Sequence, residues 1–107
     1  MTEIRKHWLN QLPPIPEDEL ALIRSNCVSS LADAACAFRL FRFLHRVESP
    51  AAVLMGDYCF GRFSKYLAQI DSVELTNAFS EYLKQDVLSE KGIDDYLTFL
   101  KSASRMT

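Results

Sequence analysis

The segment AAVLMGDYCFGRFSKYLA, residues 51–68, decides the fold of this 107-residue chain. It predicts one long helix, because Ser49 is a good N-cap and Pro50 suits the first helical position, where a missing N–H has no intrahelical partner. One face of that helix is apolar at three-to-four spacing. Its members are Ala52, Met55, Cys59, Phe63, Tyr66 and Ile70. We therefore expect the chain to fold around a long amphipathic helix.

Gly56 and Asp57 interrupt this otherwise strong apolar helix. A glycine inside a helix costs roughly 1 kcal/mol relative to alanine. Asp57 has apolar neighbours in sequence, and a charge buried among them needs a hydrogen-bond partner. The simplest interpretation is that another helix crosses closely at Gly56 and that a neighbouring group satisfies Asp57.

The run VLMGDY, residues 53–58, resembles the (V/I)L-x-GDY helix of the trans-type polyprenyl diphosphate synthases. More narrowly, residues 20–91 resemble the small, non-catalytic subunit of bacterial heterodimeric heptaprenyl and hexaprenyl enzymes. The resemblance implies part of the isoprenoid synthase fold, a catalytic partner chain and a role in setting the length of a prenyl product such as the menaquinone side chain. The residues it places at the partner interface or product channel are Gly56, Asp57, Tyr58, Cys59, Phe60 and Phe63.

The acidic motifs that perform catalysis in this family are missing. Catalytic members carry two aspartate-rich motifs, whose paired carboxylates hold magnesium ions against the allylic diphosphate. Where the first motif is expected, residues 29–36 contain only one carboxylate, Asp33. Asp94 and Asp95 resemble half of such a motif, but Thr98 stands in place of the closing aspartate, and acidic residues suit the first turn of any helix. We expect no catalysis by this chain alone, with magnesium bound by the partner.

Length and composition agree with a subunit. A chain of 107 residues forms a single domain with one core and is too short for a complete prenyl synthase. Its hydrophobic fraction of 49% predicts apolar surface left over for a partner. The net charge of −2, with signs interspersed, argues against nucleic-acid binding. Because neither a signal peptide nor an 18-residue apolar span is apparent, we expect a cytoplasmic protein.

The cysteines and histidines do not suggest a metal or redox site. Cys27, Cys36 and Cys59 lack C-x-x-C spacing and lie on apolar helical stretches, which is typical of small core residues. His7 and His45 have no companion ligands at metal-binding spacing.

Two helices are predicted before the GDY helix. Residues 2–12 form a short amphipathic helix that ends at a Pro-Pro pair. Residues 17–45 then form one long helix with an acidic first turn. Its second half, residues 34–44, is apolar almost all round and is therefore expected to be the central helix. The small residues at 32–37 allow a neighbour such as the GDY helix to approach closely.

Two more helices follow. Asp71 with Glu74 resembles a capping box, and Gly92 is well placed to end the helix that this box begins. The apolar stripe of that helix is Leu75, Ala78, Phe79, Tyr82 and Leu83. Residues 93–104 predict a last short helix. With no strand pattern, the fold class is all-α, a bundle of four to five helices.

Two side-chain sets have alternative interpretations. Arg39, Arg42 and Arg46 lie at three-to-four spacing and could face a diphosphate or an acidic partner, or could simply form a solvated face whose stems cover apolar surface. The second set consists of the aromatic residues Phe60, Phe63, Tyr66, Phe79 and Tyr82. These are core side chains or, under the resemblance, side chains that limit a product channel.

Three functional hypotheses remain open from sequence. The first is a regulatory subunit of a long-chain prenyl synthase. The second is a free-standing helical interaction protein, a homodimer, without prenyl chemistry. The third is a small isoprenoid enzyme, which ranks below the others because the chain lacks metal ligands.

Overall fold

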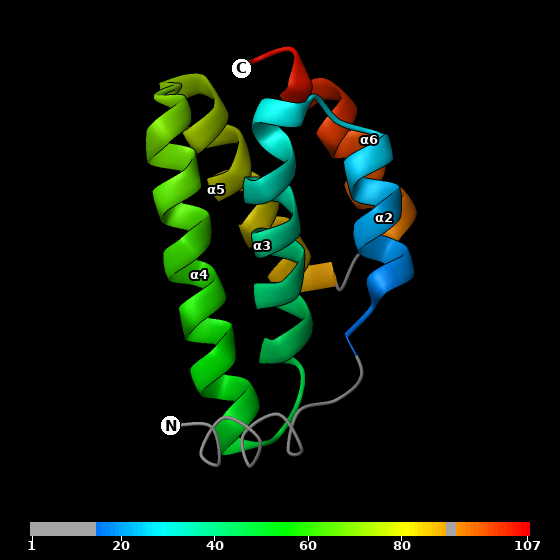
Figure 1. The fold of residues 1–107 in the computed structure, drawn as a ribbon, viewed down its shortest axis with the longest axis vertical. Coiled ribbons are helices and arrows are strands. Elements are labelled where there is room, and N and C mark those ends of the chain that lie inside the picture. Colours follow the sequence, from blue (N-terminus) through cyan, green and yellow to red (C-terminus); the bar gives the residue numbers. More distant parts are fainter. Residues whose placement is uncertain (1–14, 90–91) are drawn as a thin grey trace.

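The computed structural model describes residues 15–89 and 92–107, which form helices and contain no strand (Figure 1). The helices are α2 (Glu17–Ser25), α3 (Ser29–His45), α4 (Pro50–Ile70), α5 (Val73–Ser89) and α6 (Ile93–Ser104). The predicted all-α fold class is confirmed. The helix predicted at residues 2–12 lies outside the described residues.

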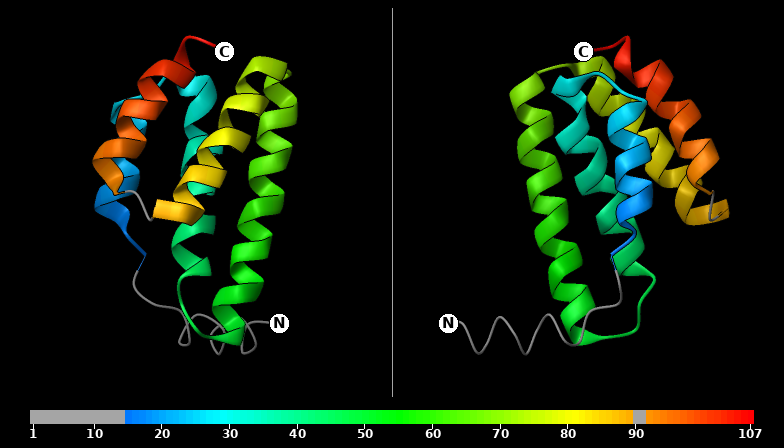
Figure 2. Two further views of the ribbon diagram at one scale, coloured as in Figure 1. Left: turned by 180° about the vertical axis from the view of Figure 1, so that it is seen from behind. Right: turned by 45° about the vertical axis from the view of Figure 1, so that its right-hand side comes forward.

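Helix α3 occupies the centre of the bundle, with α4 on one side and α2 on the other (Figure 1). Helices α5 and α6 cover the opposite face, as the view from behind in Figure 2 shows. This arrangement confirms that the apolar half of the second predicted helix is central. It also confirms the close approach of the GDY helix, because α4 runs along α3 for most of its length.

The core is built around Phe38 of α3, which is almost completely buried. Its ring centroid lies 5.2 Å from that of Phe63, 5.3 Å from that of Phe79 and 5.7 Å from that of Tyr96. Four helices, α3, α4, α5 and α6, therefore meet at one aromatic cluster. Of the aromatic set that the sequence singled out, Phe63, Phe79 and Tyr82 are core residues, Tyr66 is half-buried and Phe60 is exposed.

The prediction of a single helix over residues 17–45 is wrong. Helix α2 ends at Ser25, and α3 begins at Ser29 and runs back in the opposite direction (Figure 1). The turn is held by local and distant bonds: Asn26 Nδ2 donates to the Leu22 carbonyl at 2.8 Å, and Val28 N–H donates to Ser104 Oγ at 3.3 Å. Apolar spacing continues through the turn because both helices face the same core, so the spacing alone conceals the break.

The predicted capping box at Asp71 is also wrong. Asp71 adopts the left-handed conformation with φ of 57° and ends α4, its N–H donating to the Leu67 carbonyl at 3.2 Å. Aspartate is one of the few residues besides glycine that visit this conformation readily. The next residue, Ser72, caps α5, since its Oγ accepts from Leu75 N–H at 3.1 Å. The connection is so short that adjacent residues end one helix and cap the other.

The predicted start of α4 and the predicted bounds of α6 are confirmed. Ser49 caps α4, accepting a hydrogen bond from Ala52 N–H at 3.1 Å, and Pro50 occupies the first helical position as predicted. Helix α6 has the predicted bounds, with acidic residues in its first turn. Gly92, expected to end the preceding helix, instead takes the N-cap position of α6.

Candidate functional site

The inner face of α4 crosses α3 closely at Gly56. A Cβ atom on Gly56 would lie 2.9 Å from His45 Cδ2 and 3.5 Å from Leu44 Cβ. The first distance is too short for a real contact, so the crossing requires a glycine or a shift of the His45 ring. The predicted close helix crossing at Gly56 is confirmed.

Asp57 is not buried, although its neighbours in sequence are apolar. Its side chain is 67% exposed, and its Oδ1 atom lies 3.6 Å from Nε2 of His45. The helical period carries Asp57 to the outside of α4, one position beyond the buried Gly56. Its charge therefore remains in water, beside an imidazole at the end of α3.

The residues predicted for an interface or channel divide between two faces of α4, because consecutive residues of a helix point in different directions. Facing the core are Gly56, Cys59 and Phe63. Facing outward are Asp57, Tyr58 and Phe60. The second group is exposed on the surface, whereas Cys59 and Phe63 are accessible only through the hollows that they line.

An apolar hollow of about 210 Å³ lies between α4 and α5. Apolar side chains dominate its lining, with three hydroxyl side chains among them. The lining consists of Phe38, Phe60, Phe63, Ser64, Leu67, Thr76, Phe79, Ser80 and Leu83. Phe60, which is 41% exposed, is the most accessible of its aromatic rings. A lining of this composition suits a hydrocarbon group better than a charged one.

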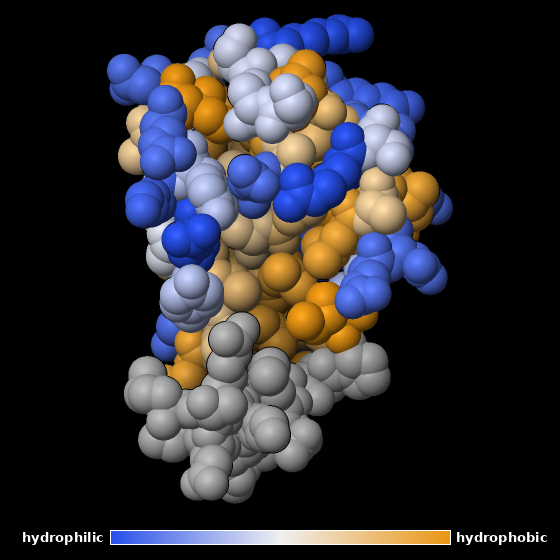
Figure 3. Space-filling model, viewed as in Figure 1, coloured by the Kyte–Doolittle hydropathy of each residue, from blue (hydrophilic) through white to orange (hydrophobic). Residues whose placement is uncertain are grey.

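A second hollow, of about 200 Å³, lies between α3 and α4. Figure 3 shows this face of the molecule, with hydrophobic side chains over its lower middle and hydrophilic ones above them and to either side. The charged side chains at the hollow have partners within the chain: Arg24 pairs with Asp33 at 3.2 Å, and Arg62 Nη2 donates to the Tyr66 hydroxyl at 2.6 Å. Cys36 is also part of the lining.

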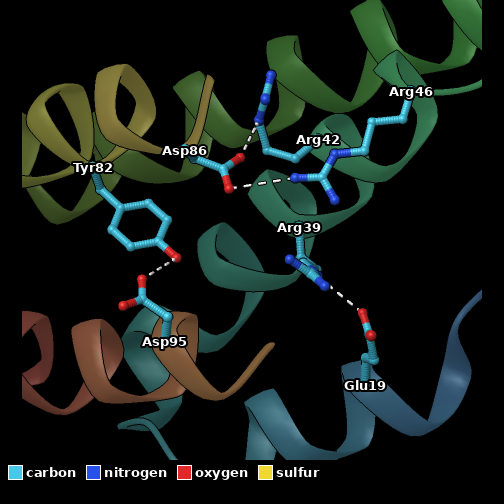
Figure 4. A network of polar contacts seen from close by, with 7 residues as sticks. All are labelled: Glu19, Arg39, Arg42, Arg46, Tyr82, Asp86 and Asp95. Atoms are coloured by element: carbon cyan, nitrogen blue, oxygen red, sulfur yellow. Dashed lines mark hydrogen bonds and ion pairs between the residues drawn. The ribbon is translucent and has the colours of Figure 1, made fainter. Parts of the chain in front are cut away.

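The arginines of α3 are paired with carboxylates of the same chain (Figure 4). Arg39 Nε lies 2.9 Å from Glu19 Oε1 on α2. Arg42 Nε and Arg46 Nη2 both contact Asp86 on α5, at 2.5 Å and 3.4 Å. An external diphosphate would have to compete with these internal carboxylates for the guanidinium groups. These ion pairs link α3 to α2 and to α5.

Asp86 is the site residue that sequence reasoning missed. It is only 1% exposed and lies between Arg42 and Arg46. A signal was present, because Asp86 follows Tyr82 by four residues and so continues the apolar stripe of α5. A carboxylate on such a stripe requires a basic partner, and a buried charge left without one is strongly destabilising.

Two tyrosines contribute further buried polar contacts. The Tyr96 hydroxyl donates to the Ala35 carbonyl at 2.7 Å, and the Tyr82 hydroxyl donates to Asp95 Oδ2 at 3.0 Å (Figure 4). Burial raises the pKa of both phenols well above the usual value near 10. Both are therefore neutral at physiological pH and act as hydrogen-bond donors rather than as bases.

The cysteines are free thiols. Cys36 and Cys59 are buried, as predicted, whereas Cys27 is only partly buried at the turn between α2 and α3. Burial raises the pKa of all three thiols, which keeps them protonated at neutral pH and weakly nucleophilic.

Neither metal ligation nor a membrane span is indicated by the described part of the chain. Within residues 15–89 and 92–107, the acidic, histidine and cysteine side chains do not gather in groups of three or more that could hold a metal ion. The helices in these ranges also lack the length and apolar character needed to cross a membrane.

Comparisons with protein-family models, with curated proteins and with solved structures found no match to this chain. The class of protein is therefore defined by the fold alone: an all-α bundle whose long helix α4 carries the GDY motif and one wall of an apolar hollow.

Proposed function

We propose that this chain is the non-catalytic regulatory subunit of a heterodimeric long-chain polyprenyl diphosphate synthase, and that it adopts part of the isoprenoid synthase fold. It binds the catalytic chain and helps set the length of the prenyl product. The observation that carries this proposal is the apolar hollow between α4 and α5, which α4 lines with Phe60 and Phe63, on the C-terminal side of the VLMGDY motif in the same helix.

The hollow provides a steric basis for control of chain length. A prenyl tail is pure hydrocarbon, and its burial is favourable by roughly 25 cal/mol per Å² of apolar surface. Phe60 and Phe63 both line the hollow from α4. If the tail grows along this wall in the complex, the bulk of these rings limits how far it extends.

The chemistry belongs to the partner. The chain lacks both aspartate-rich motifs, and the arginines of α3 are already occupied by Glu19 and Asp86. Magnesium and the two diphosphate substrates would therefore bind to carboxylates of the catalytic chain. The present chain contributes apolar surface, which stabilises the assembly when it becomes buried.

The proposal is tested by co-expressing this chain with the prenyl synthase homologue of its host that carries both aspartate motifs. We expect the two chains to co-elute and long prenyl products to form only when both are present. Phe60→Ala should lengthen the product, because it removes a ring from the hollow. Val73→Ala is the control, since it trims an exposed apolar side chain of α5 that does not line the hollow.

A chain that elutes without the synthase and leaves its product unchanged contradicts the proposal. That result would favour the homodimeric interaction protein instead. A magnesium-dependent activity of the purified chain alone would contradict the non-catalytic role.

A further inference from the structure

Helix α4 has an outer face that no other described helix covers. Helix α3 lies on one side of α4 and α5 on another, and the remaining side forms an edge of the bundle (Figures 1 and 2). Three large apolar residues on this helix are about half exposed: Val53, Leu54 and Tyr58. Between them and the end of α4 lies Gly61, where an added Cβ would meet nothing within 4 Å.

Gly61 weakens the helix without serving any contact inside the chain. Glycine is among the poorest residues for a helix interior, and the close approach that justifies Gly56 is absent here. A glycine that exposes the helix backbone is useful when the backbone of another molecule must come near.

The charges in the row of α4 that contains Gly61 are arranged symmetrically, while the adjacent Arg62 lies in the neighbouring row and donates to the Tyr66 hydroxyl. Residues four apart form one row along a helix, and on the outer face of α4 this row contains Asp57, Gly61 and Lys65. Both charged side chains are exposed. The acid precedes the glycine by one helical turn, and the base follows it by one turn.

We infer that this face of α4 pairs with the same face of a second copy of the chain, with the helices antiparallel and crossing at Gly61. When i±4 rows of two helices align, the helices cross at about 50°. A twofold axis at Gly61 then brings Asp57 of each copy opposite Lys65 of the other. The contact is isologous, so the ion pair forms twice.

The apolar residues beside the charged row complete the interface. Leu54 and Tyr58 lie in the neighbouring row and become buried when the second helix packs at Gly61. A second copy is the occupant favoured by charge, because one helix face that carries both signs at equal distances from a glycine complements itself.

This inference is independent of the proposed function. The hollow between α4 and α5 is lined by Phe60 and Phe63, whereas Leu54, Gly61 and Lys65 are not part of its lining. Pairing through the outer face therefore leaves the hollow accessible.

The test is sedimentation equilibrium of the 107-residue chain over a range of concentrations. We expect a dimer whose dissociation constant rises about tenfold in Asp57→Lys and in Lys65→Asp, because each places like charges opposite one another twice. The double variant should recover the wild-type value. Lys65→Asp is the cleaner single variant, since Asp57 also lies near His45. Lys101→Asp, an exposed lysine on α6, is the matched control and should leave the dimer unchanged.

Gly61→Leu adds a steric test. Its side chain separates the two backbones, so we expect a monomer that keeps the helical circular dichroism of the wild type. A wild-type chain that is monomeric at every concentration overturns the inference. A dimer that tolerates Gly61→Leu and both charge reversals also overturns it. A dimer with the expected responses but no effect on prenyl products contradicts only the proposed function.

Discussion

Two glycines of the same helix, five residues apart, have opposite surroundings. Gly56 lies on the inner face of α4 against His45 and Leu44 of α3, whereas Gly61 lies on the outer face with open space around it. Both positions carry the same intrinsic penalty in a helix. The role of a helical glycine therefore depends on what faces it. The inner face of α4 packs against α3, whereas no other described helix covers its outer face.

The largest expected difference along α4 lies between two phenylalanines, Phe63 on the inner face and Phe60 at the exposed edge of the hollow. Phe63 on the inner face contacts Phe38 and Phe79, so Phe63→Ala should lower the free energy of unfolding by about 3–5 kcal/mol. Phe60→Ala should cost only about 1 kcal/mol, because that ring is already partly in water. Urea unfolding followed by circular dichroism measures both. Equal losses would show that the two faces are packed alike.

A smaller effect is expected from coupling at the close crossing. Gly56→Ala gains helix propensity but brings its new methyl group against the His45 ring. In a His45→Ala background the obstruction is gone, so the substitution should be more favourable there by about 1 kcal/mol. A double-mutant cycle of unfolding free energies gives this coupling directly. Independent effects of the two substitutions would mean that His45 moves aside without cost.

The smallest effect is expected at the outer glycine. Gly61→Ala should raise the free energy of unfolding by about 0.5–1 kcal/mol when measured at concentrations where the chain is monomeric, because the methyl group meets open space. The same variant should weaken self-association in sedimentation experiments. Destabilisation of the monomer would indicate that this side of α4 is covered after all.

The sequence predicted correctly the features that depend on residues close together in the chain, and it missed features that depend on contacts between distant residues. The start of α4 was predictable because the cap at Ser49 involves residues three apart. The end of α2 was not, since the turn is tied in part to Ser104, at the far end of the chain. The assignment of the α5 cap to Asp71 failed because two helices compete for adjacent residues, and the backbone conformation of Asp71 decides between them.

At the candidate site, too, the sequence indicated individual residues, whereas the structure identified the groups that they contact. The sequence indicated Gly56 as a close crossing, and the structure identifies His45 as the group it meets. The sequence offered the arginines as ligands for an anion, and the structure pairs Arg42 with the buried carboxylate of Asp86, which is 44 residues away in the chain. Partners so distant in sequence cannot be found from helical spacing.

By itself, the sequence of this protein determined the all-α class, the amphipathic faces, the cap at Ser49 and the acidic first turn of α6, because helical period and terminal interactions depend on neighbours within one or two turns. Only the tertiary structure decided where the second predicted helix turns back, which carboxylates neutralise the arginines and which face of α4 stays uncovered. Those outcomes depend on how separate helices pack around Phe38, and packing joins residues that no local pattern relates.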